Sequence, residues 1–145
     1  MAADYDIVSS GADVQILGPT SILDVTRFGI QTKPSGVLVY VNVPQEKVSD
    51  SEAQVTLEGY ALLVEAAMRL EGVIGMRPEQ DVDASGLIAD YMVVTVGVDS
   101  DAPDAINPLT TDVRILTRYF ATAAGFSVGI GQPIAQALAG LRAAI

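Results

Sequence analysis

The sequence predicts an α+β domain in which a mostly antiparallel sheet packs against two or three helices. Valine occupies every second position from Val37 to Val43, and residues 87–98 are apolar on both faces, which is typical of strands. Residues 53–70 carry apolar side chains at helical spacing and follow Ser49-Asp50-Ser51-Glu52, a capping box. A length of 145 residues suits one domain, so we expect residues 1–145 to fold as a unit.

The first half is expected to begin with two short strands, 5–8 and 14–17, separated by Ser9-Ser10-Gly11. After a turn at Gly18-Pro19-Thr20, residues 22–43 predict a β-hairpin that closes at Lys33-Pro34-Ser35-Gly36. Proline and glycine favour such a tight turn because they supply the required dihedral angles. A helix over about 50–71 follows, and Gly72 suits its C-terminal cap.

The second half is expected to begin with a loop over 73–86, which contains Pro78 and three acidic residues. A central strand follows at 87–98, and then an acidic loop at 99–108. Residues 111–124 fit a helix or a strand, and we favour a helix because Thr111 can cap its start and Gly125 its end. A short strand at 126–130 and a terminal helix from Pro133 complete the chain. Both halves order strands before a helix, a similarity too faint to predict a repeat.

The composition excludes several kinds of chemistry. The chain has 18 acidic and 8 basic residues, a formal net charge of −10, and no His or Cys. Without these two residues it has no Ser-His-Asp triad, no thiolate nucleophile and no Cys- or His-based zinc site. The negative charge disfavours binding to nucleic acid, whose affinity depends on Lys and Arg, and to anionic membranes. We therefore expect no catalytic residues, no cofactor, no membrane association and no sequence-specific contact with nucleic acid.

Two acidic segments are the candidate cation sites. Asp99, Asp101 and Asp104 offer carboxylate oxygens of the kind that Ca²⁺ prefers. The segment lacks the glycine and the final glutamate of an EF-hand loop, so we interpret it as a solvated loop and keep the three residues only as metal candidates. Glu79, Asp81 and Asp83 form a second acidic segment. Carboxylates of the two segments could act as an acid–base pair only if the folded chain brings them together.

Residues 125–132 are rich in glycine, and residues 120–141 carry no charge. The glycine segment lacks the residues of a phosphate-binding loop, so we expect its glycines to serve close packing and a turn. The uncharged run has the length of a membrane span, but it contains glycines, Pro133 and two glutamines. We interpret it as an interface with a neighbouring subunit, and the core of a monomer is the alternative. The interface candidates are Leu62, Leu70, Leu138 and Leu141.

One stretch of the sequence resembles a known class of proteins. Residues 24–37 (DVTRFGIQTKPSGV), the alternating valines that end at Val43-Pro44, the capped helix that follows and the terminal 138–145 (LAGLRAAI) are similar to small virion proteins of tailed phages that infect actinobacteria. The resemblance implies a non-catalytic subunit of the capsid, the head–tail neck or connector, or the tail. Such a subunit assembles in the host cytoplasm, associates with itself and contacts other virion proteins. A small ligand-binding or regulatory α+β domain is the alternative function.

Overall fold

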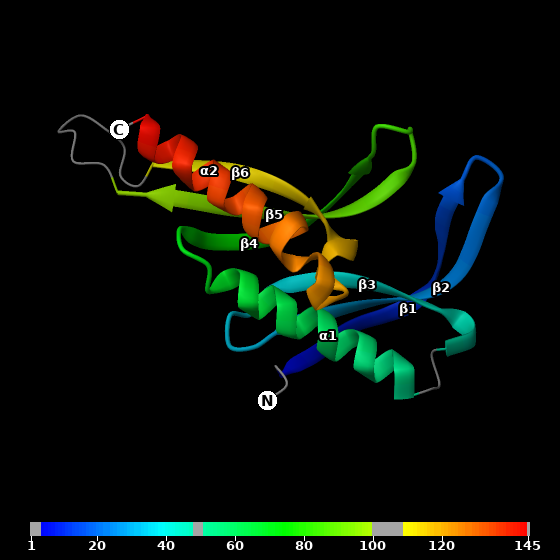
Figure 1. Cartoon of the computed structure of the whole chain (residues 1–145). Helices are drawn as coiled ribbons and strands as arrows, with labels where there is room; N and C mark the ends of the chain where they lie inside the picture. The colour runs from blue at the N-terminus through cyan, green and yellow to red at the C-terminus, as the bar shows by residue number, and fades with distance from the viewer. Residues whose placement is uncertain (1–3, 48–50, 100–108, 145) are drawn as a thin grey trace.

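The computed structural model describes residues 4–47, 51–99 and 109–144, and within them the order of elements is βββα, repeated once (Figure 1). The first unit comprises β1 (Tyr5–Gly18), β2 (Ser21–Thr32), β3 (Leu38–Pro44) and α1 (Ser51–Met68). The second comprises β4 (Val73–Val82), β5 (Ile88–Val98), β6 (Leu109–Leu116) and α2 (Gln132–Ala143). The predicted α+β class is confirmed, with the antiparallel strands divided between two sheets of order β1-β2-β3 and β4-β5-β6.

The first unit matches the prediction except at its start. The expected pair of short strands is wrong, because β1 is continuous and Ser9, Ser10 and Gly11 all pair with β2. A register shift after Ile7 absorbs the irregularity, so these small residues can stay in the ladder. The hairpin over 22–43 and the helix are confirmed, and Gly72 has the positive φ (86°) expected near a helix end. Ser49 and Asp50 of the capping box lie outside the described residues.

The second unit corrects three predictions. Residues 73–82 form β4 rather than a loop, and residues 109–116 form β6 rather than the start of a helix. Residues 126–130 do not form the predicted strand. Two short 3-10 turns, η2 (Thr117–Phe120) and η3 (Ala123–Gly125), follow β6, and one turn of π-helix, η4 (Ser127–Gly131), then leads into α2. Val113 and Ile115 lie opposite Val94 and Met92 of β5. Cross-strand apolar pairing of this kind outweighs the local signals for a helix cap and a loop.

Both units contribute to one hydrophobic core. Alternate residues of the central and third strands point toward the helices, because side chains alternate between the two faces of a strand. The largest contributions come from β3, α1, β5 and α2: Val39, Val41, Val43, Leu57, Ala61, Val64, Met92, Val94, Val96, Ile134 and Leu138. Packing against a helix stabilises a small sheet, because it removes the apolar face of the sheet from water. The two units therefore depend on each other for their burial.

Two hairpins project from this core. The β1–β2 turn and the β4–β5 turn lie at the same end of the molecule, and both helices run away from that end (Figure 1). We call residues 12–25 the first arm and residues 79–91 the second arm. Because both turns lie at one end, β1 and β4 run in the same direction, as do β2 and β5, and β3 and β6. The second unit thus repeats the first in strand order and in direction.

A buried carboxylate ties α1 to the β2–β3 turn. The Glu65 side chain is only 2% exposed. Its Oε2 accepts a hydrogen bond from Thr32 Oγ1 (2.7 Å), and its Oε1 accepts from Ser35 Oγ (2.9 Å) and from the Ser35 backbone N–H (3.2 Å). Hydrogen bonds to a charged group are stronger than those between neutral groups. Glu65 therefore sets the position of the helix along the first sheet.

We expect Glu65→Ala to lower the free energy of unfolding by about 1–3 kcal/mol, because it leaves the buried Thr32 hydroxyl without a partner and removes the two bonds from Ser35. Urea denaturation followed by circular dichroism measures this change. Glu58→Ala on the same helix is the control, since Glu58 is only partly buried, and it should cost less than about 0.5 kcal/mol. Equal losses for the two variants would contradict the role given to Glu65.

Candidate interaction surface

The two arms enclose a cleft of about 330 Å³. The first arm lines it with Gln15, Ile16 and Leu17, and the second arm lines it with Leu87 and Ile88, among others. Tyr40 and Asn42 of β3, Tyr60 of α1 and the segment 116–118 close its base. Burial, and to a smaller extent the Asp90 carboxylate, raises the pKa of the Tyr60 hydroxyl. The cleft is thus lined by aliphatic side chains of both arms together with polar groups, which include Gln15 and Asp83 on the arms and Asn42 and Asp90 at its base.

Large aliphatic side chains are exposed along both arms. They are Val14, Leu17 and Ile22 on the first arm and Val82 and Ile88 on the second. Ile22, the most exposed of them at 64%, pairs across the hairpin with Ile16, and Val82 pairs with Ile88. Hairpin ends that face only water are usually polar, and grouped apolar side chains on a surface mark a contact with another molecule. The arms are therefore the candidate interaction surface of the chain.

An ion pair at the base of the cleft joins the two sheets. The Arg27 guanidinium of β2 donates two hydrogen bonds to the Asp90 carboxylate of β5, at 2.9 and 2.7 Å. Arg27 also donates to Asn42 Oδ1 (3.3 Å) and stacks on the Tyr40 ring, 4.6 Å from its centroid. The hydrogen bond to Asp90 is the main cause of the raised pKa of Arg27. Both side chains are about four-fifths buried, so solvent screens this pair weakly.

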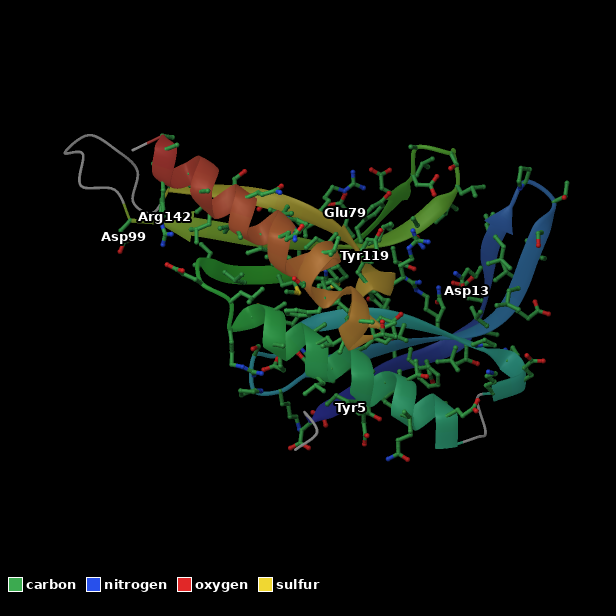
Figure 2. All side chains as sticks on the ribbon, viewed as in Figure 1. Tyr5, Asp13, Glu79, Asp99, Tyr119 and Arg142 are labelled. Atoms are coloured by element: carbon green, nitrogen blue, oxygen red, sulfur yellow. The ribbon has the colours of Figure 1, made fainter. Side chains whose placement is uncertain are left out.

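The outer face of the second sheet carries a second set of ion pairs. Arg114 of β6 contacts Glu79 (3.5 Å) and Asp81 (3.2 Å) of β4, and its guanidinium lies 4.1 Å from the centre of the Tyr91 ring. Beside it, a hydrogen bond from Thr95 Oγ1 (2.8 Å), together with Arg77, lowers the pKa of the Asp112 carboxyl. Figure 2 shows Glu79 near the base of the second arm and Asp13 on the first.

The structure describes four of the six predicted cation residues. Asp99 is exposed at the end of β5, and Asp101 and Asp104 lie outside the described residues. Glu79 and Asp81 lie on a strand and bind Arg114, while Asp83 Oδ1 accepts from the backbone N–H groups of Ser85 and Leu87 in the arm turn. Within residues 4–47, 51–99 and 109–144, no three acidic side chains group as a metal site would require.

The four leucines predicted at an interface have different environments. Leu138 belongs to the core, Leu70 and Leu141 pack against it, and Leu62 is exposed on α1. Phe120, Ile130 and Ile134 of the uncharged run are also buried in the core, so much of this run serves the chain's own packing. Among the helices that the structure describes, none has the length and apolar character to span a bilayer.

The glycine-rich segment packs closely, as predicted, and borders a surface pocket. A Cβ atom on Gly129 would lie 2.9 Å from Cγ of Tyr119, so only glycine fits there without displacing the ring. The pocket, about 560 Å³, is lined by Tyr91, Tyr119 and Arg114 together with Val128 and Pro133. Sequence reasoning missed it because Tyr91 and Tyr119 lie far apart in the chain.

Sequence reasoning also missed the arms and the Arg27–Asp90 pair. The arms had one usable signal, since Ile16, Leu17 and Ile22 surround a turn where polar residues are usual. The ion pair had none, because its partners are far apart in the sequence and belong to different sheets. Comparison of the chain with protein-family models, curated proteins and solved structures finds no match.

We expect a double-mutant cycle on Arg27→Ala and Asp90→Ala to give a coupling energy of about 1–2 kcal/mol, because the pair is bidentate and mostly buried. Denaturation midpoints of the wild type, both single variants and the double variant measure it. Lys33 and Asp6 provide the control, since their contact (3.0 Å) joins two side chains that are more than half exposed. Their coupling should stay below about 0.5 kcal/mol, and an equal value for both pairs would contradict the role of Arg27.

Proposed function

We propose that the protein is a non-catalytic structural subunit that assembles with copies of itself into a symmetric oligomer. The observation that carries this proposal is the pair of projecting arms with exposed aliphatic side chains. Burying one such side chain contributes about 1.5–3 kcal/mol, so five of them supply a substantial driving force for association. A subunit interface is the usual place for apolar side chains on projecting hairpins.

The sheet edges support the same proposal. Each sheet has two outer strands, β1 and β3 in the first and β4 and β6 in the second, and β3 lies against β4. β1 and β6 are at the opposite edges, and among the described residues each pairs with a single strand. The outer edge of a strand can pair with a strand of another molecule. The sequence resemblance to virion proteins of tailed phages suggests the setting, a capsid, a head–tail neck or connector, or a tail. In such a setting the subunit would also contact other virion proteins.

We expect the wild-type protein to sediment as an oligomer at physiological salt, where the charge of −10 is screened beyond about 8 Å. Leu17→Asp and Ile22→Asp on the first arm should shift it toward the monomer by at least tenfold in the dissociation constant. Sedimentation velocity over a range of protein concentrations measures this shift.

Val55→Asp is the matched control for these two variants. Val55 is 65% exposed on α1 and belongs to neither arm, and the substitution adds the same charge. It should leave the sedimentation profile unchanged. A wild-type protein that remains monomeric at high concentration would contradict the proposed function, and an equal effect of all three variants would contradict the role of the arms.

The pocket beside Tyr119 favours a second candidate function, the binding of a small molecule. Its volume of about 560 Å³ is within the range of ligand sites, and two tyrosines and an arginine line it. An aromatic ligand without charge fits this lining best, because it can stack on the tyrosine rings, whereas Arg114 is already bound by Glu79 and Asp81.

If the pocket binds such ligands, a thermal-shift screen of neutral aromatic compounds should find some that raise the melting temperature of the wild type by several degrees. Tyr119→Ala should abolish the shift, whereas Tyr5→Ala, at a site remote from the pocket, should preserve it. Shifts that persist in the Tyr119 variant would contradict binding at this pocket.

A further inference from the structure

The interface between the two units within one chain provides a template for the interface between chains. The third strand of the first unit, β3, lies against the first strand of the second unit, β4, and α1 also contacts β4. A contact of a third strand with a first strand is heterologous, since it joins two different surfaces of similar units. The corresponding surfaces at the outer ends of the chain are β6 with α2 on one side and β1 on the other.

The strand registers define which residues of the two units correspond. β2 ends at Thr32, and β5 ends at Val98. When these two ends are aligned, the strand registers also align Pro44, the end of β3, with Leu116, the end of β6. In this alignment Asp90 corresponds to Asp24. Asn42, opposite Arg27 in the first sheet, corresponds to Arg114, opposite Val93 in the second.

The charged contacts follow the same correspondence. In the first sheet, Arg27 and Asn42 hold Asp90 of the second unit, and Asn42 Nδ2 lies 3.5 Å from its carboxylate. In the second sheet, the position of Asn42 is taken by Arg114, whose side chain is 43% exposed. In the first unit, the position of Asp90 is taken by Asp24, which is exposed on the first arm. Arg114 is already bound within its own sheet by Glu79 and Asp81, so the two outer ends correspond through the positions of Arg114 and Asp24 rather than through a free cation.

We infer that copies of the chain associate head to tail, with β6 of one copy against β1 of the next and Arg114 of the first copy beside Asp24 of the second. This inference rests on the proposed self-assembly and assigns its interface. A second copy fits the surface because the chain already contains one contact of the same kind, between β3 and β4. Heterologous contacts of this type generate a ring when the rotation closes and a filament when it does not.

Cross-linking tests the inference directly, because the chain has no cysteine of its own. Asp24→Cys and Arg114→Cys are made as separate variants, and each is treated with bis(maleimido)ethane alone and in an equimolar mixture. A head-to-tail contact gives no cross-link in either variant alone, and it gives a dimer in the mixture. A chain with both substitutions should yield a ladder of multimers. Lys33→Cys with Asp6→Cys in one chain, an exposed pair in contact at 3.0 Å, calibrates the reach of the reagent.

Ser85→Cys, in the turn of the second arm, is the control for chance collisions. It takes the place of Asp24→Cys in the mixture with Arg114→Cys, and this mixture should give no cross-linked dimer. Sedimentation velocity on the same samples separates the two proposals. An oligomer whose mixed variants fail to cross-link, or whose single variants cross-link alone, overturns the head-to-tail interface and leaves self-assembly in place. A monomer in sedimentation overturns the proposed function itself.

Discussion

The contact of Arg27 with Asp90 determines how the two sheets are placed, and the rest of the structure depends on that placement. The pair joins β2 to β5, and Asn42 and Tyr40 hold the guanidinium from the same face of the first sheet. A bidentate arginine–carboxylate contact accepts little variation in angle. It therefore fixes the spacing of the arms at the point where they leave the core, and with it the cleft between them.

The core alone would allow the two units more freedom. Valines and other aliphatic side chains make contacts that depend little on direction, and cores of this kind tolerate some rearrangement. Directional groups occur at two places around this core, Glu65 beneath the β2–β3 turn and Arg27 between the sheets. The first positions α1 within its own unit, and the second positions one unit against the other.

The sequence predicts the first unit better than the second, and the reason is local. The alternating valines of β3 and the helical spacing of α1 give clear patterns that tertiary contacts reinforce. In β4 the acidic residues and Pro78 resemble a loop, and they are tolerated because their side chains lie at an edge and because Arg114 neutralises Glu79 and Asp81. In β6 the cap signal of Thr111 is overridden by pairing with Val96 of β5. The candidate surface depends on contacts between distant segments, which no local pattern encodes.

The repeated order of elements has a consequence for symmetry. Because each chain contains two similar βββα units that follow one another in the same direction, a closed assembly of any number of chains would present twice that number of similar units around its axis. Such an assembly would approximate a symmetry higher than its true one. A partner with twice the rotational symmetry of the assembly could then meet a similar unit at each of its own symmetry-related positions. Only every second of these units would have the same sequence.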